Sequence, residues 1–358
     1  MQKEYETALT SSNLTNKISN GTGNKKANLE LFSKIPIKQI DVDIIKKTTV
    51  IPLGNAIGMK LYTKGVLVVG MSQINSDDGK TVKPYENSGI EEGDTIVAVD
   101  GENIENTEEL INKLNESNGN EINVEYIKDN KTMQASITPV KSKDSYKIGL
   151  WVRDTQAGVG TATFYEPSTN KFMTLGHGIT DIDTGKIVNI ANGELVTANI
   201  ISIVKGEKGN PGEILGTINN ENPIGEIENN TSFGVYGQVK NNTYLNKSEE
   251  MEVASRNEIK EGKAKILCQL DNSGVKEYEI EIEKIYINNN ENNKSMLIKV
   301  TDQNLLNLTG GIIQGMSGSP IIQSEKFVGA ITSVLVNDPQ QGYGVFGDIL
   351  IKQMREAK

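Results

Sequence analysis

The stretch Gly315-Met316-Ser317-Gly318-Ser319-Pro320 places a serine between glycines, after the apolar pair Ile312-Ile313 and before Ile321-Ile322. Glycine permits positive φ angles and a close backbone approach. A loop that aims two backbone N–H groups at one point beside a nucleophile needs both properties. We therefore predict a tight turn between two strands, with Ser317 as a candidate nucleophile and the amides of Gly315 and Ser317 as candidate oxyanion donors.

Two other interpretations of this stretch stay open, because turns rich in glycine and serine are common. The loop could be a purely structural turn. Alternatively, Ser319 could be the nucleophile in place of Ser317.

The sequence contains one histidine, His177, held between Gly176 and Gly178 at the end of an apolar segment. A lone histidine is usually structural or merely exposed. Its glycine neighbours nevertheless give it a defined position, and no other side chain has an unperturbed pKa that suits a general base near neutral pH. If a serine–histidine pair operates in this chain, His177 must be the base.

A third group is expected to orient the imidazole and stabilise its charged form. The candidate acids between His177 and Ser317 are Asp181, Asp183, Asp271 and Asp302. Asp302 precedes Ser317 by 317 − 302 = 15 residues and gives the chain order histidine, aspartate, serine. The alternative for Asp302 is a surface cap or turn residue.

Composition limits the class of protein and its partners. A chain of 358 residues is long enough for two ordinary domains. Its 35 glycines, 6 phenylalanines and single tryptophan are closer to a turn-rich β protein than to a helical bundle. The formal net charge of −10 disfavours nucleic acid or an anionic membrane surface as the main partner.

Metal and membrane sites are not expected either. The single cysteine, Cys268, excludes an intrachain disulfide, and one cysteine with one histidine cannot build a typical structural zinc site. We expect Cys268 to be a buried small hydrophobe and the protein to need no metal or cofactor. No run approaches the roughly 18–20 apolar residues of a membrane span, and residues 1–6 lack the apolar core of a signal peptide, so we expect a soluble chain.

Three regions follow one another along the chain. Residues 1–47 are polar, and we expect a flexible N-terminal arm. Residues 48–140 hold short apolar runs separated by turn signals, with one helix predicted to start at Thr107 as its N-cap. Residues 145–358 are again rich in strand-like runs, and only 349–355 looks helical, which predicts a β-barrel or sandwich with a terminal helix.

The stretch 87–101, with Gly93-Asp94-Thr95-Ile96-Val97 at its centre, resembles a bacterial PDZ domain. In such domains a glycine-containing loop presents backbone N–H groups to a peptide carboxylate, and the peptide adds a strand to the sheet. The matching loop here consists of Gly54, Asn55, Ala56, Ile57 and Gly58. The alternative for this loop is an ordinary β-turn that binds nothing.

The pattern Gly-x-Ser-Gly-x-Pro resembles the nucleophile loop of chymotrypsin-like proteases, although Ser319 stands where those usually have glycine. Over residues 48–358 the chain is similar to the stage IV sporulation protein B serine peptidases. The likeness rests on the PDZ segment, Leu150-Trp151-Val152-Arg153-Asp154, Gly158-Val159-Gly160-Thr161, Gly176-His177-Gly178, residues 310–320 and Val336-Asn337-Asp338-Pro339. The resemblance implies a mainly β protein in which a PDZ domain precedes a chymotrypsin-like double β-barrel. It also assigns catalytic roles to His177, Asp302 and Ser317, although the aspartate of chymotrypsin-like enzymes usually lies far nearer the histidine.

The same resemblance implies a sporulation signalling protease. Such a protein is exported from the forespore into the space between the forespore and mother-cell membranes. It cleaves itself and then a membrane-bound regulator, and an intramembrane protease released in this way processes a late sigma factor. The hydrophobic export anchor of the family is absent from this sequence, so localisation rests on resemblance alone. The alternative function is a catalytically inactive scaffold that binds peptides through its PDZ domain.

Overall fold

A computed structural model describes residues 23–31, 35–44, 48–219, 223–245, 248–287 and 293–356. The chain divides into two compact units, Met1–Thr48 and Thr49–Lys358. In the first unit, β1 (Gly23–Leu31) and β2 (Ile35–Ile44) form an antiparallel hairpin. The sequence analysis expected a flexible arm here and did not anticipate these strands, while the rest of that arm lies outside the described residues.

The second unit begins with a closed barrel. The ring closes because β4 pairs with β15 along one edge and with β13 along the other. Its apolar core includes Ile57, Met59 and Leu61 of β4. Around the ring, the strands are β4 (Ala56–Met71), β15 (Ile190–Val204), β17 (Gly225–Thr231), β18 (Gly234–Val239), β14 (Lys171–Thr174) and β13 (Leu150–Glu166).

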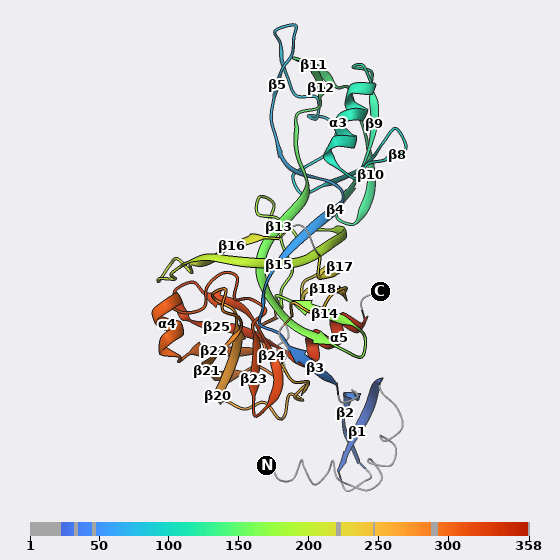
Figure 1. Cartoon of the computed structure of the whole chain (residues 1–358). Helices are drawn as coiled ribbons and strands as arrows, with labels where there is room; N and C mark the ends of the chain where they lie inside the picture. The colour runs from blue at the N-terminus through green and yellow to red at the C-terminus, as the bar shows by residue number, and fades with distance from the viewer. Residues whose placement is uncertain are drawn as a thin grey trace. The chain divides into compact units, whose positions relative to one another are not determined.

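The PDZ domain is inserted between two strands of this first barrel (Figure 1). The second half of β4 leaves the barrel and pairs with β7 (Thr95–Val99) on one edge, where Val66 faces Ile96. The start of β13 pairs with the other edge, where Val152 faces Val68. The remaining pieces are β8 (Glu102–Asn103), β9 (Ile122–Lys128), β10 (Lys131–Ile137) and α3 (Thr107–Glu116), flanked by the short hairpins β5 (Ile74–Asn75) with β6 (Thr81–Val82) and β11 (Val140–Ser142) with β12 (Ser145–Lys147).

The start of the PDZ domain, which the sequence analysis placed at residue 48, therefore does not agree with the strand pairing. The strand β3 (Thr49–Pro52) pairs with β13 and with β19 (Met251–Glu252), and the first half of β4 closes the first barrel. Both were assigned to the PDZ domain by the sequence analysis. A single strand serves both modules because β4 continues without a break through residues 62–65.

Helix α3 confirms the expected helix but corrects its cap. The N-cap is Asn106, whose side chain accepts a hydrogen bond from the Glu109 amide at 3.0 Å. Thr107, the predicted cap, is the first helical residue, and its amide donates to the carboxylate of Asp154 at 2.7 Å. The strand β13 thus caps a PDZ helix from outside the PDZ segment.

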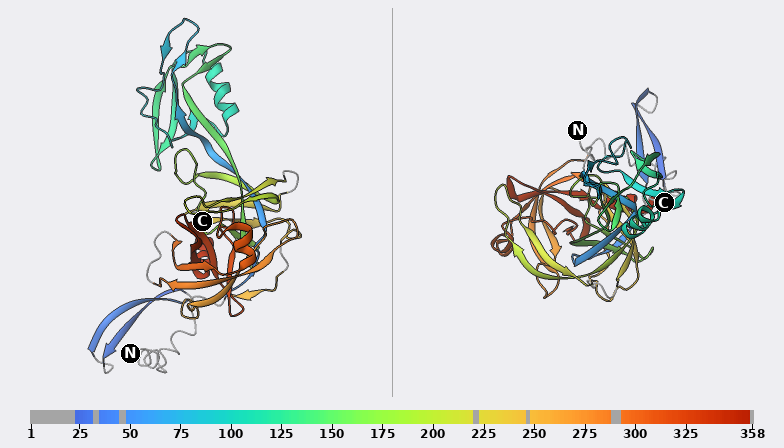
Figure 2. Two further views of the ribbon diagram at one scale, coloured as in Figure 1. Left: turned by 90° about the vertical axis from the view of Figure 1, so that its left-hand side faces the viewer. Right: turned by 90° about the horizontal axis from the view of Figure 1, so that it is seen from above.

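A second closed barrel follows, drawn in orange to red in Figures 1 and 2. Its strands are β20 (Gly262–Cys268), β21 (Lys276–Ile285), β22 (Met296–Val300), β25 (Asp338–Phe346), β24 (Lys326–Leu335) and β23 (Pro320–Gln323). The expected terminal helix, α5 (Gly347–Glu356), packs on β24 through the buried Leu350 and Met354. A short helix that the sequence analysis missed, α4 (Gln303–Thr309), lies between β22 and the serine loop. The fold is therefore mainly β, with a PDZ domain and a chymotrypsin-like double barrel.

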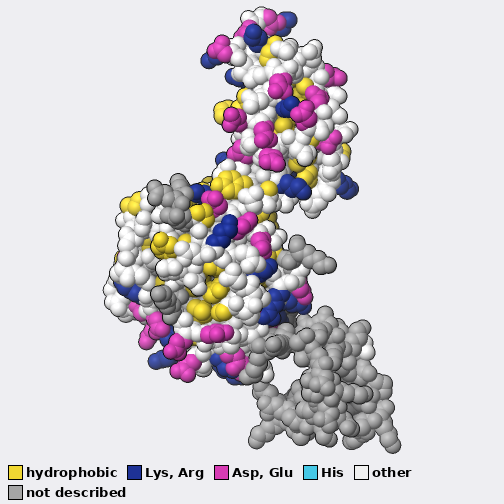
Figure 3. All heavy atoms as spheres, turned by 45° about the vertical axis from the view of Figure 1, so that its right-hand side comes forward, with side chains coloured by type: hydrophobic (Ala, Val, Ile, Leu, Met, Phe, Trp, Pro, Cys, Tyr) yellow, Lys and Arg dark blue, Asp and Glu magenta, His cyan; other side chains and the backbone are white. Residues whose placement is uncertain are grey.

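Figure 3 shows acidic and basic side chains mixed over the face that it presents. No helix in the described residues is long and apolar enough to cross a membrane.

The two barrels meet at Gly318. This residue has φ of 95°, and a Cβ there would overlap the Thr161 carbonyl oxygen of the first barrel and stand 2.6 Å from the Leu175 amide nitrogen. The aromatic rings of Phe164 in β13 and Phe327 in β24 add an edge-to-face contact, with centroids 5.4 Å apart. The serine loop of the second barrel is thereby held against the segment that leads to His177.

We expect Gly318→Ala to destabilise the protein strongly, because it adds a backbone clash to the strain of a left-handed conformation. The matched control is Gly209→Ala, since Gly209 has φ of 87° and an added Cβ there meets nothing within 4 Å. The control should cost about 1–2 kcal/mol from strain alone. The measurement is the free energy of unfolding in denaturant, and equal losses for the two variants would contradict the close approach.

Candidate active site

The serine loop leaves two amides available. Within it, the Met316 amide donates to Ile313 O at 3.1 Å and the Ser319 amide donates to Met316 O at 3.0 Å. Among the described residues, no acceptor is found for the N–H groups of Gly315 and Ser317. The Gly315 carbonyl is held by Thr161 Oγ1 at 2.7 Å, so the peptide that precedes Met316 is fixed from the first barrel. These contacts suit the predicted pair of oxyanion donors.

The hydroxyl of Ser317 is partly buried and donates to the Thr332 carbonyl at 3.1 Å. This bond holds the side chain in a resting position. Before it could attack a substrate, the hydroxyl would have to rotate away from Thr332 toward the imidazole. A hydrogen bond between a catalytic hydroxyl and its base is often long or misaligned before substrate binds.

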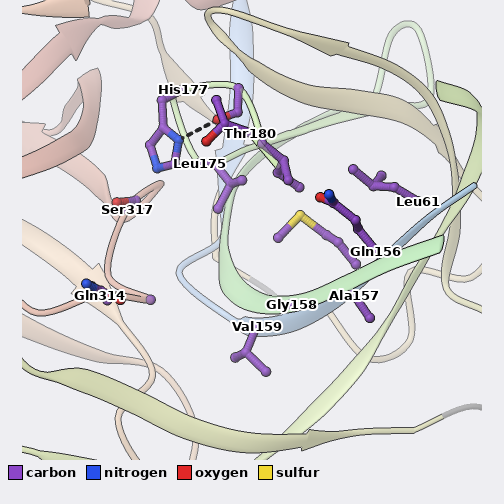
Figure 4. A pocket seen from close by; sticks show the side chains of 14 residues that line it. Leu61, Gln156, Ala157, Gly158, Val159, Leu175, His177, Thr180, Gln314 and Ser317 are labelled. Atoms are coloured by element: carbon purple, nitrogen blue, oxygen red, sulfur yellow. Dashed lines mark hydrogen bonds between the residues drawn. The ribbon is translucent and has the colours of Figure 1, made fainter. Parts of the chain in front are cut away.

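His177 is held by its own backbone neighbourhood. Its Nδ1 lies 2.9 Å from the Gly178 carbonyl oxygen, a contact that a protonated Nδ1 makes as donor (Figure 4). The other nitrogen, Nε2, is then the unprotonated atom that can accept a proton. The two residues before it, Leu175 and Gly176, both have positive φ, 69° and 72°. A leucine in that region is strained, and such strain persists only where the surrounding structure imposes it.

Burial lowers the pKa of His177 below its usual value, and the Gly178 carbonyl opposes this shift in part. Desolvation disfavours the charged imidazolium, so the ring is neutral at neutral pH. A neutral ring is the form that a general base requires.

A hydrogen-bond chain that sequence reasoning missed connects the serine and histidine segments. The Asn293 side chain donates to the Gly176 carbonyl at 3.1 Å, one residue before His177. Thr332, whose carbonyl accepts from Ser317, donates its own hydroxyl to Asn293 O at 3.2 Å. No sequence motif marks these residues, because the contacts join residues that are 15, 39 and 117 positions apart in the chain.

Asp302 has a different role from the one predicted for it. It is the N-cap of α4, where its Oδ1 accepts from the Leu305 amide at 3.0 Å, and its Oδ2 faces the Glu279 amide at 3.4 Å. It does not line the pocket that holds His177 and Ser317. These contacts agree with the alternative that the sequence analysis gave for Asp302, a cap residue. Both of its carboxylate oxygens are directed to backbone amides of the second barrel.

The other candidate acids are also engaged away from the imidazole. Asp181 is buried and accepts from Arg153 Nη1 at 2.6 Å, from Gln156 and from two backbone amides. Asp183 accepts from the second guanidinium nitrogen of Arg153 at 2.7 Å. Asp271 pairs with Lys276 at an exposed turn. The group that orients His177 in this structure is the Gly178 carbonyl.

Burial decides between the two serines of the loop. Ser319 has 0% of its surface exposed and lies near the Cys268 thiol, whereas Ser317 lines the pocket. Cys268 is buried as expected, and burial raises the pKa of its thiol to about 11. Of the two serines, Ser317 is therefore the one that lines the pocket.

Of the five residues assigned to a PDZ carboxylate loop, Gly54 and Asn55 lie between β3 and β4, and the other three belong to the part of β4 that closes the first barrel. The Gly54 amide donates to Ala162 O at 2.9 Å, and the Ala56 amide donates to the Gln269 side chain at 3.2 Å. Gly58 pairs with Val159 and Val196. Because barrel contacts already use these groups, the structure gives residues 54–58 a role in barrel closure in place of the predicted one.

A cavity of about 370 Å³ opens beside Ser317 and His177. Figure 4 shows these two side chains at one side of the pocket and Leu61 and Gln156 at the other. Among the described residues, no group of three or more histidine, cysteine, aspartate or glutamate side chains could hold a metal ion.

The fold and the site together define a chymotrypsin-like peptidase with an inserted PDZ domain. A family model described as SpoIVB peptidase S55 matches residues 144–351, and a PDZ domain model matches residues 57–138. The first match covers more than half of the chain. This protein belongs to the SpoIVB peptidase S55 family.

Similarity to other known proteins is weaker. A protein named "Putative zinc metalloprotease LL2128" from Lactococcus lactis subsp. lactis (strain IL1403) is 28% identical over 99 residues, which are 28% of this chain and 22% of that protein. This chain thus spans about a fifth of that relative's length.

Two solved structures are also similar to parts of this chain. The PDZ domain of the SdrC-like protein (Lmo2051) from Listeria monocytogenes is 23% identical, with 25% of this chain and 87% of that chain covered and a TM-score of 0.20. The active form of the Rv3671c protease from M. tuberculosis is 13% identical, with 56% and 74% covered and a TM-score of 0.31.

We expect Asp302→Asn to keep both stability and activity, because asparagine and aspartate are equally good N-caps. Asp302→Ala should lower the free energy of unfolding by about 0.5–2 kcal/mol through loss of the cap. The measurements are denaturant unfolding and the rate of peptide cleavage. A loss of activity near 10⁴-fold in Asp302→Asn, the size seen when a triad aspartate is so changed, would instead place Asp302 behind the imidazole.

The lowered pKa of His177 predicts the acid limb of the pH–activity profile. A base is active only when deprotonated, so activity should persist on acidification past the unperturbed histidine value of about 6.5 and fall at lower pH. The measurement is the rate of covalent labelling of Ser317 between pH 4 and pH 8, since labelling needs no bound peptide. An acid limb centred above pH 6.5 would contradict the buried, neutral imidazole.

Proposed function

We propose that this protein is a serine endopeptidase in which Ser317 is the nucleophile and His177 is the general base. The observation that carries the proposal is that Ser317 and His177, from different barrels, line one pocket. The available amides of Gly315 and Ser317 lie in the same loop as the nucleophile and support it further.

The chemistry follows from these positions. Nε2 of His177 takes the hydroxyl proton as Ser317 Oγ bonds to the peptide carbonyl carbon, and the carbonyl oxygen gains negative charge. The two amides stabilise that charge. The proton then passes from Nε2 to the leaving amine as the peptide C–N bond breaks, which leaves an acyl-enzyme. Water, deprotonated by the same imidazole, hydrolyses the ester and restores Ser317.

The biological assignment rests on family membership. We propose a sporulation signalling protease, exported from the forespore into the space between the two membranes, that cleaves itself and a membrane-bound regulator. The cleaved regulator would activate an intramembrane protease that processes a late sigma factor. The PDZ domain would hold an extended peptide, including a segment of this chain.

The second candidate function is a catalytically inactive scaffold that binds peptides through its PDZ domain. One observation favours it: Ser317 donates to Thr332 O in this structure, so the hydroxyl is not directed to the imidazole. A structural turn would have the same contact.

A fluorophosphonate probe separates the two functions. We expect the probe to label Ser317 in the wild type and in Ser319→Ala, and to label neither Ser317→Ala nor His177→Ala. Removal of the nucleophile or of the base typically costs about 10⁶-fold in rate. The adduct is located by mass spectrometry of peptides. A folded wild type that binds peptides but carries no label would favour the scaffold.

A further inference from the structure

The pocket beside Ser317 has an apolar floor and no charged side chain among the residues that line it. The floor is formed by Met59, Leu61, Leu175 and Ile179, of which the first three are at most 5% exposed as residues. Its volume of about 370 Å³ lies near the lower end of the range of about 300–1,000 Å³ for ligand sites. This size and lining suit one large apolar side chain.

The side of the scissile bond that this pocket serves follows from the imidazole. Because Nδ1 of His177 contacts Gly178 O, Nε2 must deliver the proton to the leaving amine, which therefore lies within hydrogen-bond reach of Nε2. The acyl carbonyl oxygen points instead to the Gly315 and Ser317 amides. The residue that carries the leaving amine is thus the one nearest His177, and two floor residues, Leu175 and Ile179, are each two positions from His177 in the chain.

We propose that this pocket is a specificity site for a large apolar residue, such as leucine, methionine or phenylalanine, directly after the scissile bond. The inference rests on the proposed peptidase function and deepens it by naming a class of substrate. Burial of such a side chain against the apolar floor would favour binding. An acidic or basic side chain would lose its hydration there without an oppositely charged partner among the lining residues.

The polar rim of the pocket is held in place, so the site is formed before substrate arrives. Gln156 donates its side-chain amide to Asp181, which is buried and also bonded to Arg153. A rim residue fixed in this way limits rearrangement on binding, and preformed sites lose less free energy to ordering.

Gly158 offers a way to fill the pocket without disturbing the barrel. It faces Met59 in the β13–β4 register, and directly paired residues project from the same face of a sheet. Two positions along that face, a Cβ on Gly160 would meet Leu175 and Met59, whereas a Cβ on Gly158 meets nothing within 4 Å. The φ of Gly158 lies outside the left-handed region, so larger residues fit its backbone. A side chain at position 158 therefore extends over the pocket floor.

The test uses the full chain and the variants Gly158→Ala, Gly158→Val and Gly158→Leu. A proteome-derived peptide library first identifies, by mass spectrometry, the bonds that the wild type cleaves. Synthetic pairs of one cleaved peptide then differ only in the residue after the bond, leucine or alanine. We expect wild-type kcat/KM to favour leucine at least about tenfold, in the range by which apolar pockets discriminate.

The Gly158 series should then remove that preference step by step. Gly158→Leu is expected to lower kcat/KM for the leucine peptide about tenfold or more relative to the alanine peptide, so that the wild-type preference for leucine disappears. Gly158→Ala should lie nearest the wild type. Fluorophosphonate labelling of Ser317 should fall less than cleavage of the leucine peptide in all three variants, because the probe carries no amino-acid residue on the leaving-group side.

Each other outcome overturns a defined part of the reasoning. If the wild type is not labelled at Ser317, the proposed peptidase function fails. If labelling is normal but the variants alter preference only for the residue before the scissile bond, the pocket serves the acyl side and the inference is wrong. Normal labelling with unchanged preferences, or with no cleaved library peptide, would also reject it, because an open apolar pocket would admit such peptides.

Discussion

The active-site geometry depends on the backbone approach at Gly318. No side chain fits where this residue meets the Thr161 carbonyl and the Leu175 amide, so the serine loop and the histidine segment can lie together only through glycine. Thr161 contributes twice, since its hydroxyl also holds the Gly315 carbonyl. Ser317 and His177 come from different barrels, and this contact sets their separation. Other interbarrel contacts, including the Phe164–Phe327 ring pair, add apolar burial but could tolerate small shifts.

Local patterns in the sequence predicted those parts of the fold that depend on local geometry. The glycines around Ser317 predicted a turn, the cap signal at Thr107 predicted α3 to within one residue of its true cap, and the uniqueness of His177 left one possible base. The double barrel and the PDZ domain came from resemblance, and the structure confirms both. The role of Asp302 shows the limit of chain order as a guide. The order histidine, aspartate, serine suited a triad although the spacing did not, and the helix of seven residues that follows Asp302 accounts for its contacts.

What the sequence could not reveal are contacts between distant segments. Asn293 reaches Gly176, and Thr332 reaches both Ser317 and Asn293, across intervals that no local periodicity encodes. The same reason explains the error at residues 54–58. A glycine-containing segment before an apolar run suits a peptide-binding loop equally well, and only the pairing with Ala162 and Gln269 shows that barrel closure uses its amides.

The continuity of β4 and β13 through both modules determines how this protein can be divided. A fragment that begins at residue 145 lacks β4, and the first barrel then has an open edge at β15 and another at β13. Open edges of that length expose unpaired backbone groups and favour aggregation. The PDZ domain therefore cannot be separated by a single cut at either of its ends. A nick in an exposed turn of the insertion, such as residues 77–80, would leave every barrel strand in place. The two pieces would stay joined by the hydrogen bonds between β4 and β13.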